Sequence, residues 1–124
     1  MARNKLIGGV AEVRYGGETL LFRGELKWNF QQYFKKTVAG RDGKIHGHTR
    51  EPNVAYIEGK FTFDGAKTTK DLEAIEGAIV TVRLGDGRML VLRDSVVAGE
   101  ITPGGDEGEV TLRFEGAEGE ELSA

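Results

Sequence analysis

The chain has 124 residues, close to the commonest size of one domain, so we expect a single domain over residues 1–124. It contains no cysteine, which excludes thiol catalysis, thiolate zinc sites and iron–sulfur clusters. No stretch approaches the roughly 20 apolar residues of a membrane-spanning helix, and the first nine residues lack the apolar run of a signal peptide. We therefore expect no membrane partner, and synthesis in the cytoplasm.

The net charge of −3 hides a polarity along the chain. Residues 1–50 hold ten Lys/Arg and four Asp/Glu, residues 51–100 hold six and nine, and residues 101–124 hold one and seven. A basic beginning and an acidic end are typical of a nucleic-acid patch with an acidic tail, or of two surfaces that attract each other between copies. The composition also includes 19 glycines, which indicates many tight turns and a β-rich fold.

The clearest periodicity lies in residues 20–31, where apolar and polar side chains alternate as in a strand. Gly24 interrupts the apolar face and indicates a bend or bulge. A strand of this length should curve or cross between sheets, since most strands have about five or six residues. Upstream, Val10–Tyr15 also alternates, and Gly16-Gly17 predicts a hairpin turn between antiparallel neighbours.

A second alternation of the same kind runs from Ala55 to Phe63, with apolar residues on one face and polar residues on the other. Between the two alternating segments lies the polar stretch 35–53, whose glycines and Pro52 argue against a packed element. Long loops of this kind are uncommon in compact domains and are usually functional. We expect this one to be disordered or mobile in the isolated chain.

The remaining elements follow in chain order. Thr68 and Asp71 predict the start of a helix of about two turns, because the Thr68 hydroxyl can cap the Asp71 amide. Ala78–Leu84 and residues 89–97 predict a hairpin, and residues 109–115 predict the last strand. We expect the acidic end, from residue 116 onward, to be loose unless a neighbour holds it.

Few residues suggest catalysis or metal binding. His46 and His48 can present two rings to a metal, but only Glu51 is a nearby carboxylate. Glu73 and Glu76 lie one helical turn apart, and such pairs usually form a solvated face. The sequence offers no nucleophile with a base beside it, so we expect neither an enzyme nor a cofactor.

Most of these features also occur together in one known family. The segments Met1-Ala2-Arg3-Asn4-Lys5-Leu6-Ile7-Gly8-Gly9, Gly40-Arg41-Asp42-Gly43-Lys44-Ile45-His46-Gly47-His48, Pro52-Asn53-Val54-Ala55-Tyr56-Ile57-Glu58-Gly59 and Leu92-Arg93-Asp94-Ser95-Val96-Val97-Ala98-Gly99-Glu100 occur in order and near one spacing. By these segments the chain resembles the Mu-like phage tail tube protein family over almost its whole length.

The resemblance implies a mainly β fold, with two packed antiparallel sheets in a sandwich-like or barrel-like arrangement, one short α-helix and a long protruding loop. It also implies a structural subunit of the virion, with six copies per ring and rings stacked into the tube of a contractile tail. The implied partners are further copies of the chain, sheath, tape-measure and baseplate proteins, and double-stranded DNA in transient passage without specific binding.

Two alternatives stay open at this point. A tube subunit of a phage-derived bacteriocin or secretion machine belongs to the same structural class. A small β-barrel that binds single-stranded nucleic acid would explain why basic residues of the 35–53 stretch lie near Phe30, Tyr33 and Phe34.

In the tube interpretation three groups of residues have roles. The polar parity of the two alternating segments would line the bore: Arg23, Glu25, Lys27, Asn29, Glu58, Lys60 and Thr62. The 35–53 stretch would reach the adjacent ring through Lys35, Lys36, Arg41, Asp42, Lys44, His46, His48 and Arg50. A candidate acidic interface consists of Asp106, Glu107, Glu109, Glu118, Glu120 and Glu121.

Overall fold

A computed structural model describes residues 9–63, 68–105 and 108–123, which form nine strands and one helix. The elements in chain order are β1 Val10–Tyr15, β2 Glu18–Leu20, β3 Phe22–Asn29, β4 Tyr33–Ala39, β5 Ile45–Pro52, β6 Ala55–Thr62, α1 Thr69–Glu73, β7 Ala78–Leu84, β8 Met89–Ala98 and β9 Glu109–Leu122. The predicted mainly β fold with one short helix is therefore confirmed.

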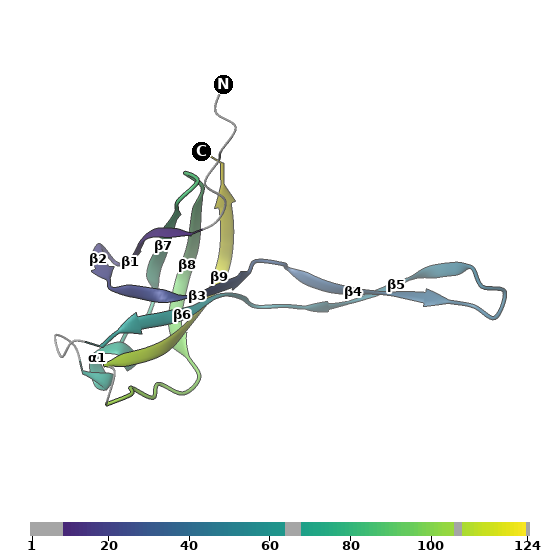
Figure 1. Cartoon of the computed structure of the whole chain (residues 1–124). Coiled ribbons are helices and arrows are strands. Elements are labelled where there is room, and N and C mark those ends of the chain that lie inside the picture. The colour runs from purple at the N-terminus through teal and green to yellow at the C-terminus, as the bar shows by residue number, and fades with distance from the viewer. Residues whose placement is uncertain (1–8, 64–67, 106–107, 124) are drawn as a thin grey trace, which may run out of the picture.

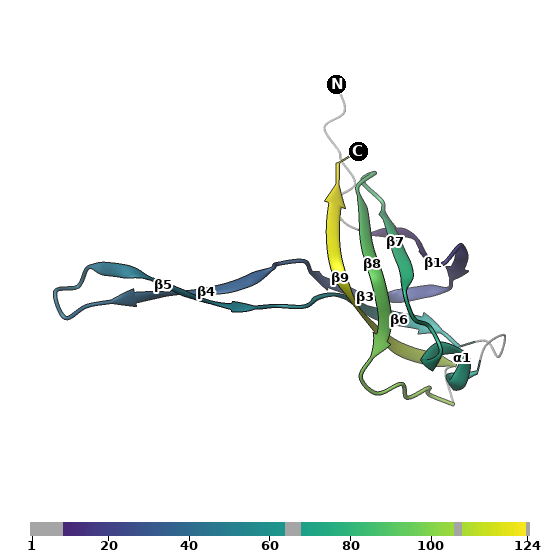
Figure 2. The ribbon, with the colours of Figure 1, turned by 180° about the vertical axis from the view of Figure 1, so that it is seen from behind.

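Seven strands form one antiparallel sheet in the order β2-β1-β7-β8-β9-β6-β3, and β4 pairs only with β5. Figures 1 and 2 show that the large sheet curls into a barrel-like body, while β4 and β5 extend away from it as an arm. Because the sheet curls, its two halves pack face to face. The two predicted layers are thus two parts of one continuous sheet.

The predicted strand over residues 20–31 is divided at Leu21. Before this break β2 pairs with β1 at one edge of the sheet, and after it β3 pairs with β6 at the opposite edge. The Thr62 N–H donates to the Leu21 carbonyl at 2.7 Å, which attaches the corner to the end of β6. The single long strand that was predicted is therefore two strands, and the break at Leu21 lets the chain pass from one edge of the curled sheet to the other.

The predicted irregularity at Gly24 is confirmed by two shifts in the β3–β6 register around it. Glu25, which follows, has a left-handed backbone with φ of 57°. Few non-glycine residues adopt this conformation, and here it restores the alternation, so Glu25 and Lys27 both lie on the exposed side.

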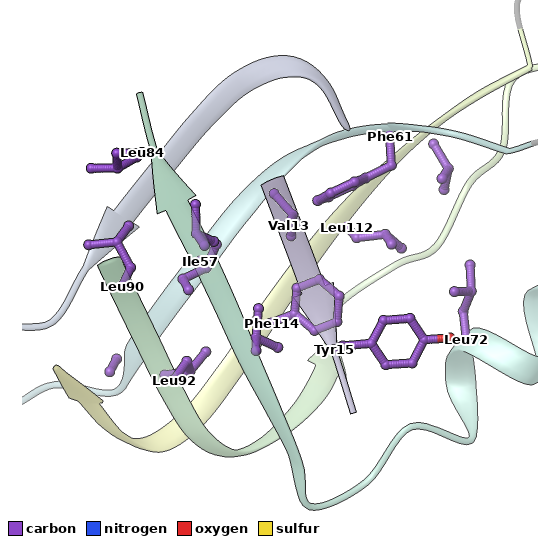
Figure 3. Packing of buried hydrophobic residues seen from close by; sticks show 14 residues of the cluster. Val13, Tyr15, Ile57, Phe61, Leu72, Leu84, Leu90, Leu92, Leu112 and Phe114 are labelled. Atoms are coloured by element: carbon purple, nitrogen blue, oxygen red, sulfur yellow. The ribbon is translucent and has the colours of Figure 1, made fainter. Parts of the chain in front are cut away.

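The core lies inside the curl of the sheet (Figure 3). Every second residue of β6 is buried, from Ala55 through Ile57 to Phe61, and Phe114 of β9 is fully inaccessible. The rings of Phe61 and Phe114 meet edge to face at 6.4 Å, a favoured aromatic geometry. Leu72 of α1 closes one end of this core.

The helix begins where the sequence predicts. The Thr68 hydroxyl accepts from the Asp71 N–H at 3.2 Å, and the Asp71 carboxylate accepts from the Thr68 N–H at 2.8 Å. This capping box satisfies two amides that helical bonds leave free. The helix is shorter than expected, because it ends at Glu73.

The prediction of a loose acidic end is wrong. β9 continues to Leu122 and pairs with β8 along this second half, from Leu122 opposite Met89 to Glu118 opposite Arg93. Part of the reason is a close contact with a residue far away in the sequence. Gly119 lies directly under the ring of Phe30, where a Cβ would come within 2.5 Å of the ring atoms, so only glycine allows this approach.

The prediction of an irregular loop over residues 35–53 is also wrong in its local structure. β4 and β5 pair from Tyr33 opposite Pro52 to Ala39 opposite Ile45, with one irregularity at Val38/Ala39. The glycines that argue against a packed element lie at the tip and at the irregularity, where a hairpin tolerates them. The segment protrudes as predicted, as a β-hairpin arm (Figure 1).

Candidate assembly surfaces

The first surface is the outward side of β3, β6 and β9, which we term the polar face. It brings together all seven residues predicted to line a bore, and β9 adds Glu109, Thr111, Arg113 and Glu115 beside them. The pairing register sets side chains in rows across the strands. One row runs Lys27–Glu58–Arg113 and another Asn29–Tyr56–Glu115.

Ion pairs connect these rows. Glu109 accepts from Arg23 at 3.5 Å and lies 3.7 Å from the Lys60 ammonium, and Lys60 also lies 3.2 Å from Glu25. Arg113 lies 3.8 Å from both Glu58 and Glu115. Its guanidinium also stacks 3.7 Å from the centre of the Tyr56 ring. The polar face is therefore a connected network of alternating charge.

The network changes the titration of Lys60. The hydrogen bond to Glu25, together with the negative charges of Glu109 and Glu25, raises the pKa of the Lys60 ammonium above its usual value. Lys60 therefore keeps its proton, and its ion pairs with the two carboxylates, to a higher pH than an isolated lysine would.

The sequence interpretation missed the contribution of β9 to this face. Thr111, Arg113 and Glu115 alternate with Val110, Leu112 and Phe114, so the signal was present. The alternation does not show which strand lies beside β9, because only the fold places β9 next to β6.

Asn29, the last residue of β3 and one of the predicted bore residues, has a different local role. Its side-chain oxygen accepts from the Gln31 N–H at 2.9 Å and from the Asn53 amide at 3.1 Å. The Asn53 N–H also donates to the Gln32 carbonyl at 2.9 Å. These bonds hold the two ends of the arm together where it leaves the body.

The second surface is the arm itself, and all of its predicted residues are exposed on the hairpin. Its strands also expose large apolar side chains, including Phe34 at 46% and Ile45 at 70%. Lys35 lies directly opposite Arg50 in the register, a pairing of like charges that destabilises a hairpin. Arg50 stacks on the Tyr33 ring at 4.5 Å instead of pairing with an acid.

The tip of the arm is a defined turn. The Lys44 N–H donates to the Asp42 carboxylate at 3.0 Å, and Nε2 of His46 lies 3.2 Å from the same carboxylate oxygen. His48 faces Thr37 across the hairpin. In the described part of the chain no three metal-ligating side chains come together, so His46 and His48 do not belong to a cluster that could hold a metal ion.

The candidate acidic interface is divided between surfaces. Asp106 and Glu107 lie outside the described residues. Glu109 belongs to the polar face, Glu118 and Glu120 lie 3.9 and 2.9 Å from Arg93 of β8, and Glu121 accepts from the Trp28 indole at 3.0 Å. Each described member therefore has a partner in its own chain.

The other candidates remain apart from these surfaces. Glu73 is the last residue of α1 and Glu76 lies beyond it, both exposed. With five residues, this helix falls far short of a membrane span, and the described residues contain no longer one.

Taken together, the described residues form a curled antiparallel sheet with a charge-paired face and an exposed β arm. A family model for phage tail tube proteins matches residues 4–121, and the chain belongs to this family. No curated protein matched the sequence. The protein is thus a structural subunit of a phage tail tube and a component of the virion, in a family that is structural and not enzymatic.

Proposed function

We propose that six copies form a ring, and that rings stack into the hollow inner tube of a Mu-like contractile tail through which double-stranded DNA passes. The observation that carries this proposal is the arm. It extends from the barrel with apolar side chains exposed and with Lys35 opposite the like-charged Arg50, which fits a contact with something other than its own body.

Ring closure is supported by the edges of the large sheet. In the described sheet β2 and β3 each have a paired strand on one side only. Exposed edges invite pairing with another chain, and head-to-tail pairing around a ring removes them. The polar face, which includes the edge strand β3, then becomes part of a continuous inner wall. Tape-measure protein and then DNA would occupy the bore, with sheath and baseplate proteins outside it and at its end.

Stacking is supported by charge. Residues 33–52 carry five Lys/Arg and two Asp/Glu, whereas the rest of the chain carries twelve and eighteen. A basic arm is therefore attracted to the acidic body of a copy in the next ring, for which Glu118, Glu120 and Glu121 are candidate contacts. Single exposed ion pairs contribute only about 0–1 kcal/mol, so many equivalent contacts and the exposed apolar side chains must supply the rest.

Removal of the arm tests the proposal. Because Gln32 and Asn53 are already hydrogen-bonded, two glycines can replace residues 33–52 without strain on the body. The shortened chain should remain folded by circular dichroism, because the arm contributes nothing to the core. Negative-stain images should then show rings or monomers where the full chain shows tubes.

Tubes of normal length from the shortened chain would contradict the stacking role of the arm. Particles of the full chain that never become annular or tubular at high concentration would contradict the whole proposal.

A further inference from the structure

We propose that Asp42-Gly43 at the tip of the arm is a site of spontaneous isoaspartate formation, and that Arg88 protects the matching Asp86-Gly87 of the body from the same reaction. This inference concerns the single chain and does not rest on the proposed function. The sequence holds three Asp-Gly pairs, of which the one at 64–65 lies outside the described residues. The other two provide a comparison within one chain.

The turn at the tip of the arm, between β4 and β5, is held by backbone hydrogen bonds. The Gly40 N–H donates to the Lys44 carbonyl at 3.0 Å, and the Gly43 N–H donates to the Gly40 carbonyl at 3.1 Å. The Lys44 N–H in turn donates to the Asp42 carboxylate at 3.0 Å. Gly43 has a φ of 76°, a backbone conformation that favours glycine.

The turn between β7 and β8 repeats this construction position by position. The Leu84 N–H donates to the Arg88 carbonyl at 2.9 Å, and the Gly87 N–H donates to the Leu84 carbonyl at 3.1 Å. The Arg88 N–H donates to the Asp86 carboxylate at 3.0 Å, and Gly87 has a φ of 95°. Backbone hydrogen bonding therefore does not distinguish the two Asp-Gly pairs.

Isoaspartate forms when the amide nitrogen that follows an aspartate attacks the carboxyl carbon of that side chain. A C–N bond forms, and the carboxyl hydroxyl leaves with the amide proton as water, which gives a cyclic imide. Water then adds to the imide. Cleavage of the new bond restores aspartate, whereas cleavage of the original peptide bond leaves the chain running through the side chain. One water is lost and one is gained, so the reaction needs no oxidant or other reactant. A following glycine favours the attack because it has no Cβ.

The two carboxylates differ in the side chain that contacts them. The Arg88 guanidinium donates through Nε to the second Asp86 oxygen at 2.9 Å, so both oxygens accept from Arg88. At the arm tip the side-chain partner of Asp42 is Nε2 of His46, at 3.2 Å. A guanidinium stays charged at any physiological pH, whereas a histidine ring is largely uncharged at neutral pH. Asp86 is therefore held as a carboxylate by a permanent charge.

This difference bears on the first step, which proceeds from the protonated carboxyl because its hydroxyl must leave. The Arg88 N–H has the largest effect on the pKa of Asp86 and, together with the guanidinium, lowers it below its usual value against the opposing effect of burial. Each unit by which a pKa falls reduces the protonated fraction about tenfold at neutral pH. Attack on the Asp86 carboxyl is therefore disfavoured.

The surroundings of the two pairs differ in the same direction. The side chain of Asp42 is 52% exposed and that of Asp86 is 23% exposed. All residues from 41 to 52 are exposed, whereas in the body turn the Gly85 N–H donates to the Gly9 carbonyl at 3.1 Å. In either turn the glycine amide must leave its carbonyl before it can attack. Such local opening costs less where few buried contacts hold the chain, as in the arm.

Isoaspartate at position 42 changes the tip without changing the body. It adds one methylene to the backbone of the turn and moves the carboxylate onto the α-carbon, so the bond from the Lys44 N–H and the contact with His46 are lost. The arm contributes nothing to the core, so the barrel keeps its fold.

The test follows both sites in the same chain. The purified full chain is kept dilute at neutral pH and physiological temperature for several weeks, then denatured and digested with an endoproteinase that cleaves before aspartate but not before isoaspartate. Mass spectrometry measures the uncut fraction at each site over time. Cleavage before Asp42 should be lost several times faster than cleavage before Asp86.

A reciprocal exchange tests the role of Arg88. Lys44→Arg gives the arm tip the Asp-Gly-Arg sequence of the body turn and should slow the loss of cleavage at Asp42. Arg88→Lys gives the body turn the Asp-Gly-Lys sequence of the tip and should accelerate the loss at Asp86. Both substitutions keep the positive charge and lie at exposed positions, so circular dichroism should show an unchanged fold.

Equal loss of cleavage at the two sites, or no loss at Asp42, would overturn the proposed modification site. Unchanged rates in both exchange variants would overturn the protective role of Arg88. The measurement needs no tube, so its failure leaves the proposed function standing. If microscopy shows no tubes, the isoaspartate result is equally unaffected.

Discussion

The polar face and the arm use the same kinds of residues in opposite ways. On the polar face acids lie beside bases, as in the row Lys27–Glu58–Arg113. On the arm Lys35 lies opposite Arg50, and Lys36 lies opposite the uncharged Thr49. Cross-strand pairs of opposite charge stabilise a sheet and like pairs destabilise it. The charges of the polar face are thus paired within the chain, whereas Lys35 and Arg50 of the arm face a like charge.

The contrast extends to apolar side chains. Beneath the polar face the core is fully buried, with Ile57 and Phe114 inaccessible, whereas Phe34 and Ile45 of the arm are exposed. The body thus gains its stability from its own packing, and the arm gains burial only on contact with a partner. Substitutions in the two regions should accordingly affect different measurements.

The largest expected difference is between two phenylalanines. Phe114→Ala removes a fully buried ring and should lower the free energy of unfolding by about 3–5 kcal/mol in urea titrations. Phe34→Ala should change it by less than about 0.5 kcal/mol but should shorten or abolish tubes in electron micrographs. If Phe34→Ala destabilises the body as strongly, the division between the two regions is wrong.

The same substitution at two glycines should separate the regions again. A Cβ on Gly116 would lie 2.6 Å from the Arg93 carbonyl oxygen, which the β8–β9 pairing holds in place. Gly116→Ala should therefore cost about 1–3 kcal/mol of unfolding free energy.

Gly40→Ala is the matched control at the tip of the arm. There the added Cβ meets the side chains of His46 and Asp42, which are both exposed and can move aside. Its cost should stay below about 0.5 kcal/mol. Equal losses in thermal melts of the two variants would show that the tip is as rigid as the barrel.

A charge reversal on the arm should have a smaller effect on stability and a visible one on assembly. Lys35→Glu gives Arg50 an opposite charge and should stabilise the hairpin by about 0.2–1 kcal/mol. It should also lower the salt concentration at which tubes dissociate, measured by light scattering, because the arm loses attraction for an acidic partner.

Lys36→Glu is the control for this change, since it makes the same reversal on the other face of the hairpin. It should weaken tubes less, because that face lacks the adjacent Lys35 and Arg50 pair. Tubes of unchanged salt sensitivity in both variants would show that the arm does not dock through its charges.

The smallest expected effect concerns Lys60 and pH. Because folding raises the pKa of Lys60, its contribution to stability is fully present below the unfolded value near 10.4 and is lost as pH rises through the folded value. In urea titrations between pH 9 and 11, Lys60→Met should lose stability less steeply than the wild type. Glu25→Gln, which removes the main cause of the shift, should flatten the curve in the same way.

Much of this architecture was predictable from local pattern. The alternation from Ala55 onward, the Thr68 capping box and the Ala78–Leu84 strand were all predicted with nearly correct bounds, because neighbouring residues decide them. The family could be recognised for a similar reason, since its motifs are contiguous segments.

The wrong predictions concern segments whose structure is determined by residues far away in the sequence. β9 runs on to Leu122 because β8 is available to pair with it and because Phe30 covers Gly119, and neither neighbour is close in sequence. The arm was predicted to be irregular because its composition is polar and rich in glycine. Its hairpin depends on the base, where bonds that Asn53 donates to the Asn29 side-chain oxygen and the Gln32 carbonyl bring the two strands together.

By itself the sequence determined which residues face the core, which face solvent and where turns occur, because period-two alternation and turn chemistry depend on adjacent residues. Only the tertiary structure decided which charges meet. Glu109 was predicted as part of an acidic interface, yet antiparallel pairing of β9 with β6, and of β6 with β3, sets this carboxylate between Arg23 and Lys60. A charge has its effect over a few ångströms in space, and distance along the chain does not report that separation.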